Sequence, residues 1–397
     1  MILKPSIRSN VFTNAHPLGS ELFVKNQIEE AQAQPSFEGP RNVLVIGGSS
    51  GYGLASRIAL AYGAFANTLN VSYESPPKGK RTGTAGWWNN IFFQKHAKET
   101  GNVHKDFVGD AFSQTMKKQV ADSIRENFGK VDLVVYSIAA GARPNPKTGE
   151  LVRSSIKPIG NKAMGKTIDI AKRQLKDLTV EPADDAEIQN TVYVMGGSDW
   201  QDWMDTLEAE GVLSEGVKTI SYTYVGGEST SHIYRSGTIG KAKEDLEDKA
   251  QKMHEKLQIS LGGEALISSS KAVVTKASVF IPQMPVYVSC LFDTMMRHGV
   301  HETALGHKYR LFKDMVYGNK RIVDDVGRLR LDHKEMDFAI QNETSRQMKN
   351  ITEEKLFGLE GTQMVLRDFY RMNGFAFEEI DYDKPVDMET LSKLKPE

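Results

Sequence analysis

A glycine-rich segment between an apolar run and a helical pattern constrains the fold of this chain more than any other feature. Residues 42–46 read Asn-Val-Leu-Val-Ile, and strands buried on both faces of a parallel sheet have this composition. Residues 54–63 form a helical pattern that ends in a glycine. Between the two patterns stands Gly47-Gly48-Ser49-Ser50-Gly51-Tyr52-Gly53. Strand, glycine turn and helix in this order predict the first unit of an α/β fold.

The glycine turn also predicts a site for a phosphate group. Glycine lets the backbone turn tightly and come close to a pyrophosphate, because no Cβ stands in the way. The free N–H groups and the dipole at the start of the following helix favour an anion. We therefore expect residues 47–53 to bind a dinucleotide; an ordinary tight turn, which also uses glycine, is the alternative.

The rest of the chain continues the alternation of strands and helices. Further strands are expected over 68–74, 104–108, 131–136, 218–224 and 265–270, with helices over 112–128, up to about 256 and from 272 to 280. This order predicts an α/β fold with a doubly wound parallel sheet. We expect a single domain over 1–397 with its core at about 41–282. Its additions are an extended, proline-broken lead-in over 1–40, an excursion over 141–200 and a helical and loop extension over 283–397.

Composition excludes several classes of function. With 50 Lys and Arg against 51 Asp and Glu the net charge is −1, whereas general nucleic-acid binding needs a clustered basic field. A single cysteine, Cys290, excludes an intramolecular disulfide and a multi-cysteine zinc site. His298, His301 and His307 lie near Glu302 without a metal-ligand motif, so no metal site is expected. No stretch has the length and apolar character of a signal peptide or membrane span, which predicts a cytoplasmic protein without stable membrane association.

Two segments of the excursion differ sharply in charge. Residues 143–177 contain nine Lys and Arg and three Asp and Glu, whereas residues 181–210 contain nine acidic residues and no basic one. The basic segment suits an acidic partner, but the acidic segment also offers it ion-pair partners within the chain. Both interpretations stay open.

Residues that follow the later strands predict how a dinucleotide would lie. Glu74 closes the second strand, where a carboxylate accepts hydrogen bonds from the adenosine ribose and repels a 2′-phosphate. This favours NADH over NADPH, although the basic residues over 78–81 offer a phosphate site. Asp110-Ala111 follow the third strand, where adenine is usually contacted. Small residues over 137–141 follow the fourth, where the nicotinamide ribose passes close to the backbone.

A tyrosine and a lysine are the expected catalytic pair. Short-chain dehydrogenases, which transfer hydride on this fold, usually carry Tyr-x3-Lys. Among the thirteen tyrosines only Tyr309, with Lys313, has that spacing, and this pair lies beyond the last predicted strand of the sheet. The better candidate is Tyr234, which follows the 218–224 strand and precedes a helix that contains Lys241 and Lys243.

Helical geometry alone favours Lys241 as the partner of Tyr234. Seven residues rotate by about 700° along a helix and share a face, whereas the nine residues to Lys243 rotate by about 900° and place it opposite. A partnership with Lys243 requires either that Tyr234 precede the regular helix or that the helix be irregular, and Gly237 and Gly240 would permit this.

Four motifs, at residues 47–57, 109–112, 195–197 and 234–243, together resemble the trans-2-enoyl reductase family. Its members are enoyl-acyl-carrier-protein reductases and trans-2-enoyl-CoA reductases. The resemblance extends from residues 4–5 and 14–17 to the 369–375 region. It implies an enlarged short-chain dehydrogenase fold with a Rossmann core, which uses NADH, acts on a thioester of acyl carrier protein or coenzyme A, and works as a monomer.

The resemblance also implies roles for individual residues. The proton donor is the tyrosine of a Tyr-x8-Lys motif, which falls on Tyr234 and Lys243, and a second tyrosine, Tyr224, contacts the substrate. On this basis Lys243, rather than Lys241, holds the nicotinamide ribose. The implied cofactor contacts are Gly47, Gly48, Ser49, Ser50, Gly51, Tyr52, Tyr73, Glu74, Asp110, Ala111, Ile138, Ala139, Lys243, Val273, Val274 and Thr275.

The expected reaction is NADH-dependent reduction of a trans-2-enoyl thioester, the last reductive step of fatty acid elongation. Hydride attacks Cβ, negative charge builds on the thioester oxygen, and a phenol aimed there stabilises the transition state. Reduction of crotonyl-CoA in fermentation and carbonyl reduction are the alternatives; a carbonyl reductase would carry lysine where Thr238 stands. A dinucleotide sensor without catalysis would lack the tyrosine–lysine pair.

Overall fold

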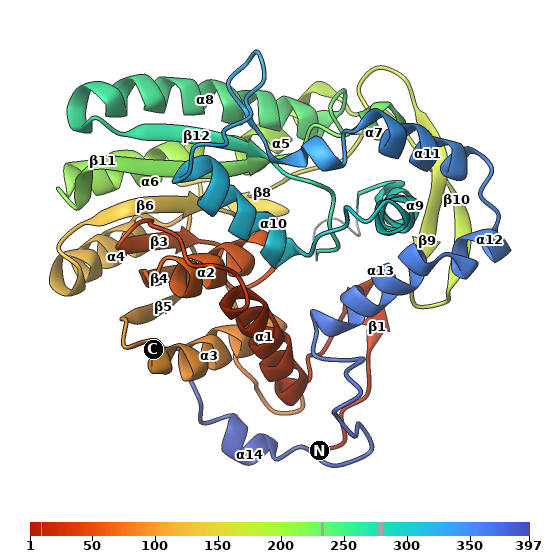
Figure 1. Ribbon diagram of the computed structural model, residues 1–397, viewed down its shortest axis with the longest axis horizontal. Coiled ribbons are helices and arrows are strands. Elements are labelled where there is room, and N and C mark those ends of the chain that lie inside the picture. The colour runs from red at the N-terminus through yellow and green to blue at the C-terminus, as the bar shows by residue number, and fades with distance from the viewer. Residues whose placement is uncertain (9, 232–233, 276–280) are drawn as a thin grey trace.

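A seven-stranded parallel sheet forms the centre of the computed structural model, which describes all residues except 9, 232–233 and 276–280 (Figure 1). The strand order is β13-β12-β11-β6-β3-β4-β5. The chain enters at β3, builds outward to β5, then returns to the other side of β3 with β6, which confirms the doubly wound sheet. The strands are β3 Asn42–Ile46, β4 Asn67–Ser72, β5 His104–Val108, β6 Val131–Tyr136, β11 Leu213–Thr223, β12 Glu264–Ser269 and β13 Leu329–Arg330.

Helices cover both faces of the sheet because its strands are apolar on both sides. In β3, Val43 and Val45 belong to one buried cluster and Leu44 and Ile46 to the other. The first cluster includes α1 Pro17–Gln32, α2 Gly51–Gly63, α3 Ala85–Ala97 and α10 Ala304–Arg310. The second includes α4 Gln114–Asn127, α6 Ser198–Ala209 and α8 Thr238–Leu261.

The expectation of an extended lead-in over 1–40 is wrong, because α1 occupies residues 17–32. Pro17 stands in the first helical turn, where its missing N–H costs nothing, and the His16 side chain accepts a hydrogen bond from Gly19 N at 3.3 Å. Val24 and Ile28 then bury one side of the helix in the first cluster. Before it lies a small hairpin of β1 Ile7–Arg8 and β2 Val11–Phe12.

Most of the remaining elements lie beyond the carboxyl ends of the strands, where Figure 1 shows α9 and the β9–β10 hairpin, whereas the short helix at Met388–Leu391 packs against the first buried cluster. The expected helix over 272–280 is not seen at residues 272–275, which have no regular structure, and the rest of that stretch lies outside the described residues. The remaining helices and strands are β7 Ala142–Pro144, β8 Leu151–Arg153, β9 Ala163–Asp169, β10 Gln174–Val180, α5 Asp185–Met195, α7 Glu228–Ser231, α9 Met284–Arg297, α11 Phe338–Lys349, α12 Glu353–Gly358, α13 Glu360–Arg371 and α14 Met388–Leu391.

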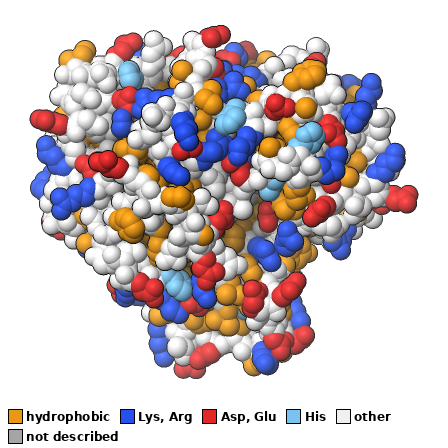
Figure 2. Space-filling model, viewed as in Figure 1, with side chains coloured by type: hydrophobic (Ala, Val, Ile, Leu, Met, Phe, Trp, Pro, Cys, Tyr) orange, Lys and Arg blue, Asp and Glu red, His pale blue; other side chains and the backbone are white. Residues whose placement is uncertain are grey.

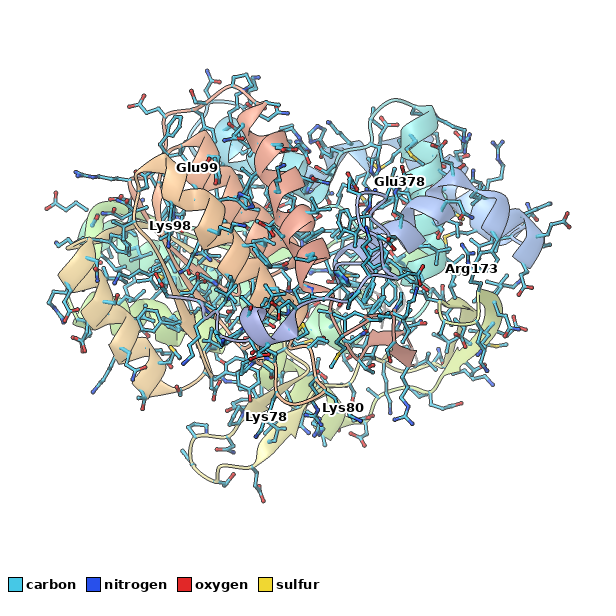
Figure 3. All side chains as sticks on the ribbon, turned by 90° about the horizontal axis from the view of Figure 1, so that it is seen from below. Lys78, Lys80, Lys98, Glu99, Arg173 and Glu378 are labelled. Carbon is cyan, nitrogen blue, oxygen red and sulfur yellow. The ribbon has the colours of Figure 1, made fainter. Side chains whose placement is uncertain are left out.

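The surface carries both signs of charge, as Figure 2 shows for one face. Lys157 pairs with Glu187 at 2.6 Å, and Arg143 lies 3.6 Å from Asp199, so the acidic segment neutralises part of the basic one. Arg173, in the turn between β9 and β10, forms no ion pair with a described residue (Figure 3). Of the helices that the structure describes, none combines the length and the hydropathy that a membrane crossing requires.

Candidate active site

The glycine turn leaves β3 in a conformation that needs glycine. Gly47 has φ = 94°, and a Cβ there would lie 2.5 Å from Ser137 O. A Cβ on Gly53 would lie 2.0 Å from Gly47 O, so α2 starts directly against the turn. Ser50, the N-cap residue, makes no side-chain capping bond, which leaves the first amides of α2 open to an anion.

A buried polar chain that the sequence analysis did not find anchors this turn to the sheet. Gly48 N donates to Asn70 Oδ1 at 2.8 Å, and Asn70 Nδ2 donates to Asp106 Oδ1 at 2.7 Å. The same Asp106 oxygen lies 2.7 Å from Arg57 Nη1, and neither side chain of this ion pair is exposed. Arg57 belongs to α2, so the turn is held from β4, β5 and its own helix.

Glu74 follows β4, which ends two residues earlier than expected. Its carboxylate accepts hydrogen bonds from Ser49 Oγ, at 2.6 Å, and from Thr84 Oγ1. The acid therefore lies beside the glycine turn, as ribose recognition requires, whereas the neighbouring Tyr73 is 81% exposed. The basic residues over 78–81 line a separate cavity of about 300 Å³ with α14; Figure 3 labels Lys78 and Lys80.

The other expected cofactor contacts lie at the same edge of the sheet. Asp110 and Ala111 follow β5, Ile138 and Ala139 follow β6, and residues 273–275 follow β12. Thr275 Cγ2 lies 3.4 Å from the position of a Cβ on Gly51, so that segment adjoins the glycine turn. In open parallel sheets this carboxyl edge, on both sides of the point where the strand order reverses, is where ligands bind.

The structure separates the two candidate lysines. The helix α8 begins at Thr238, so Tyr234 precedes it and the rotation that favoured Lys241 does not apply. A Cβ on Gly240 would lie 2.0 Å from Arg235 O, which shows how closely the turn after Tyr234 approaches the first turn of α8. Lys241 is exposed and pairs with Glu244 at 2.8 Å. Lys243 Nζ instead reaches the end of β11 and donates to Tyr222 O at 3.0 Å.

Tyr224 and Tyr234 contact each other at this edge. Their ring centroids are 4.7 Å apart and the rings are inclined by 80°. Both side chains are buried, and this burial raises the pKa of each hydroxyl above its ordinary value. Burial lowers the pKa of Lys243 to about 8. Tyr234 Oη forms no hydrogen bond with a described residue, whereas Tyr224 Oη donates to Glu335 Oε1 at 2.9 Å.

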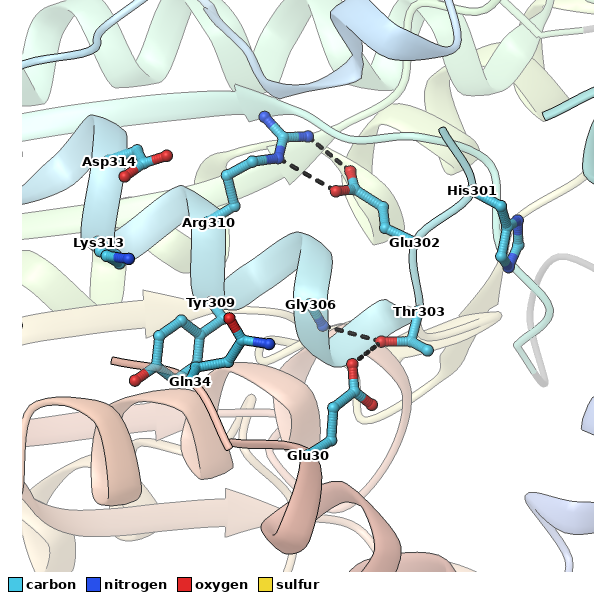
Figure 4. A pocket seen from close by; sticks show the side chains of 10 residues that line it. All are labelled: Glu30, Gln34, His301, Glu302, Thr303, Gly306, Tyr309, Arg310, Lys313 and Asp314. Carbon is cyan, nitrogen blue, oxygen red and sulfur yellow. Dashed lines mark hydrogen bonds and ion pairs between the residues drawn. The ribbon is translucent and has the colours of Figure 1, made fainter. Parts of the chain in front are cut away.

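The alternatives raised by the sequence lie elsewhere or have structural roles. Tyr309 donates its hydroxyl to Pro35 O at 3.0 Å, and with Lys313 it lines a cavity of about 440 Å³ beside α10 (Figure 4). Thr238 Oγ1 donates to Ser155 O and accepts from Lys157 N, so it anchors the excursion. Among the described residues no group of three or more His, Cys, Asp or Glu side chains is arranged to hold a metal ion.

Three family models match successive parts of the chain. The "Trans-2-enoyl-CoA reductase catalytic region" matches residues 81–317 and contains Tyr224, Tyr234 and Lys243. The "NAD(P)H binding domain of trans-2-enoyl-CoA reductase" matches residues 2–79, with the glycine turn and Glu74. The "Enoyl reductase FAD binding domain" matches residues 323–386.

The described residues over 323–386 do not fit a flavin. Val365 of α13 and Ile340 of α11 belong to the buried cluster that contains the α9 core. At two glycines of this segment, another part of the protein already fills the space beside the backbone. A Cβ on Gly361 would lie 2.1 Å from Ser289 O in α9, and a Cβ on Gly374 would lie 2.2 Å from His16 O. At these positions the segment therefore presents packing surfaces where a flavin would need a cradle.

Relatives match this chain from end to end. An enoyl-acyl-carrier-protein reductase (NADH) of Photobacterium profundum is 46% identical over 99% of this chain and 100% of the relative. A trans-2-enoyl-CoA reductase (NADH) of Ruminiclostridium cellulolyticum is 43% identical over 98% of both chains. The crystal structure of a Clostridium trans-2-enoyl-CoA reductase in complex with NADH covers 100% of both chains at 43% identity, with a TM-score of 0.97. The family models and the relatives together show that the chain belongs to the trans-2-enoyl-CoA reductase family.

Proposed function

We propose that this protein reduces the trans-2 double bond of enoyl thioesters with NADH. The observation that carries the proposal is the Tyr234 hydroxyl, which has no described protein partner and lies against Tyr224 at the same sheet edge as the glycine turn. The residues present fit NADH, because the turn offers open amides and Glu74 stands beside it as an acceptor for ribose hydroxyls. When bound there, NADH supplies the hydride that reduces Cβ.

Tyr234 acts as the proton donor. Reduction at Cβ places negative charge on the thioester oxygen, and an O–H aimed at that oxygen stabilises charge that is absent from the ground state. Burial keeps Tyr234 protonated at neutral pH because it raises the pKa of the phenol. Tyr224 orients the substrate through its contact with Tyr234.

Lys243 holds the nicotinamide ribose and offers a positive charge near the reaction. Its ammonium already donates to the Tyr222 carbonyl at the end of β11, so the side chain is directed to the sheet edge rather than to solvent. A cation there lowers the cost of forming the phenolate when Tyr234 gives up its proton.

The carrier, the cellular location and the oligomeric state are finer parts of the proposal. We infer a thioester substrate carried by acyl carrier protein or coenzyme A, a cytoplasmic enzyme and a monomer. The Photobacterium relative is named for the first carrier and the Ruminiclostridium relative for the second. Matched kcat/KM values for one acyl chain on both carriers, with light scattering for the mass of 44.2 kDa, test these points.

The experiment that tests the proposed function compares Tyr234→Phe with Tyr309→Phe. NADH oxidation is followed with crotonyl-CoA, dodecenoyl-CoA and a small ketone. We expect the wild type to reduce the two thioesters and not the ketone, and Tyr234→Phe to lose about 10²-fold or more in kcat, within the range typical of general acid catalysis. Tyr309→Phe removes a buried hydroxyl far from Tyr234 and should keep its turnover. Full turnover by Tyr234→Phe would refute the assignment.

A further inference from the structure

Glu335 lies at the centre of a hydrogen-bond cluster that no sequence motif predicted. It follows the short helical turn at Leu331–Lys334 and is 0% exposed. Its Oε1 accepts from two hydroxyls, Tyr224 at 2.9 Å and Tyr287 of α9 at 2.6 Å. Its Oε2 accepts from Ala272 N at 2.6 Å. One carboxylate therefore ties together the end of β11, the segment after β12 and α9.

A second side chain completes the cluster from α11. Gln341 Nε2 donates to Tyr287 Oη at 2.9 Å and to Glu335 O at 2.8 Å. The hydroxyl hydrogens of both tyrosines are thus committed to Glu335, and Tyr224 presents oxygen lone pairs and its ring to the rest of the site. The carboxylate sets the direction of the Tyr224 hydroxyl as well as its position.

The charges around Glu335 come from several elements. Its partner Tyr224 directly follows β11, and its partner Tyr287 belongs to α9. Tyr52 of α2, Lys271 and Asp332 also interact with it electrostatically. Burial, with a smaller contribution from Asp332, raises the pKa of Glu335 to about 7. Lys271 Nζ has no described hydrogen-bond partner, so it does not neutralise the carboxylate through a direct bond.

We propose that Glu335 is a positioning residue for the reduction, an inference that rests on the proposed function. Through Oε1 it fixes Tyr224 against Tyr234, the proton donor. Through Oε2 it fixes Ala272, and with it residues 273–275 beside the glycine turn. The same carboxylate thus holds the substrate tyrosine and the cofactor segment in fixed positions relative to each other. A shift of either changes the geometry in which the proton and the hydride are delivered.

A double-mutant cycle between Glu335 and Tyr224 tests this inference. Glu335→Ala, Glu335→Gln, Tyr224→Phe and the double variant Glu335→Gln with Tyr224→Phe are assayed with NADH and crotonyl-CoA. We expect Glu335→Ala to lower kcat about 10²-fold, the loss typical of a misplaced reacting group. Glu335→Gln retains a hydrogen-bonding group for the tyrosines but lacks one acceptor, so its loss is smaller. Because Glu335 acts partly through Tyr224 and partly through Ala272, the loss in the double variant should exceed that in Tyr224→Phe but stay smaller than the product of the two single losses.

Asp332→Asn is the matched control for a purely structural effect. Asp332 is an equally buried acid three residues earlier, which accepts from Ser269 Oγ at 2.8 Å and pairs with Arg330. The melting temperature of this variant should fall about as far as that of Glu335→Gln. Its kcat should stay within about twofold, because every hydrogen bond of Glu335 remains and the loss of the Asp332 charge only lowers the pKa of that carboxylate.

The outcomes separate this inference from the proposed function. If the wild type reduces neither crotonyl-CoA nor dodecenoyl-CoA, the proposed function is refuted. The inference about Glu335 is then refuted with it, before any variant is compared. If the wild type is active, additive losses in the cycle, or a wild-type kcat in Glu335→Gln, overturn the role of Glu335 alone. Should Glu335→Ala fail to fold, Glu335→Gln and the cycle still decide the question.

Discussion

At the scale of single residues, burial acts on the tyrosine and the lysine of this site in opposite ways. A buried phenol is kept neutral, so Tyr234 holds its proton over the whole physiological range. Burial disfavours the charged form of an amine and lowers the pKa of Lys243 to about 8. The charge of Glu247 acts in the opposite direction. The protonation of the proposed donor is therefore insensitive to pH near neutrality, whereas the charge of Lys243 is not.

This difference predicts the alkaline side of the pH profile. Because the Lys243 pKa is lowered to about 8, its positive charge is present below that pH and disappears as the pH rises through it. We expect kcat/KM for NADH to fall above about pH 8, by up to tenfold per pH unit, because kcat/KM reports groups of the free enzyme. The measurement is the rate of enoyl thioester reduction from pH 6 to 10.

Two lysine variants test whether Lys243 causes this fall in kcat/KM, the alkaline limb of the pH profile. Lys243→Arg keeps a cation at all these pH values and should move the limb above pH 10, whatever its absolute rate. Lys241→Met alters only an exposed ion pair with Glu244 and should leave the profile in place. A limb that stays near pH 8 in Lys243→Arg would assign it to a different group.

At the scale of elements, the Arg57–Asp106 pair connects α2 to β5 beneath the glycine turn. Both side chains are unexposed, so a variant that removes one charge leaves the other buried without its partner. We expect Asp106→Ala to lower the free energy of unfolding by about 3–5 kcal/mol, as measured by urea denaturation. NADH affinity should fall as well, since Asn70 loses the acceptor that orients it toward Gly48.

A compensating pair of substitutions distinguishes the two effects. Arg57→Met with Asp106→Leu replaces the ion pair by apolar side chains, which is often neutral or stabilising in a protein interior. The double variant should regain much of the lost stability while its NADH affinity, measured by fluorescence titration, stays low. Full recovery of the affinity would show that the Asn70 anchor does not matter.

The bounds of some strands were predictable from the sequence, even where the run is as polar as His104-Lys-Asp-Phe-Val108. The predicted strands over 104–108 and 131–136 have the bounds of β5 and β6. The start of β11 was missed because a register shift separates Leu213 from Lys218 and breaks the pattern. The strand β13 has two residues, too few for any periodicity, and exists only through its pairing with β12.

The site was predictable to the same degree. Glycine spacing and strand ends are local signals, so the cofactor turn and Glu74 could be located from the sequence. The choice between Lys241 and Lys243 depended on where α8 begins, and the resemblance, not the helical geometry, pointed to the lysine that reaches the sheet edge. Glu335 lies 111 residues from Tyr224 in the chain, and no local pattern reports such a contact.

At the scale of the whole molecule, the ends of the chain are fastened to distant parts. The Met1 ammonium donates to Val386 O at 2.7 Å, and His16 N donates to Asn373 O at 3.0 Å. Asp106 N, in the edge strand β5, donates to Glu397 O at 2.6 Å. The His16–Asn373 bond joins the first and third segments matched by the family models, and the pairing of β3 with β6 joins the first and second, as expected for one cooperative unit.

These connections predict a single unfolding transition. Urea curves followed by far-UV circular dichroism, by tryptophan fluorescence and by loss of NADH binding should share one midpoint, because no segment can open without releasing the others. A separate early transition seen by one probe would instead divide the chain into domains and contradict the single-domain prediction for residues 1–397.

The long reach of Glu335 also has a consequence for the order in which the protein is made. Synthesis proceeds from the N-terminus, so the glycine turn, Tyr224, Tyr234 and Lys243 all emerge well before residue 335. Until then the two hydroxyls of Tyr224 and Tyr287 lack the carboxylate that receives them in the folded protein. The hydrogen bonds of the tyrosine cluster can therefore form only after residue 335 has been synthesised, well after the residues of the glycine turn.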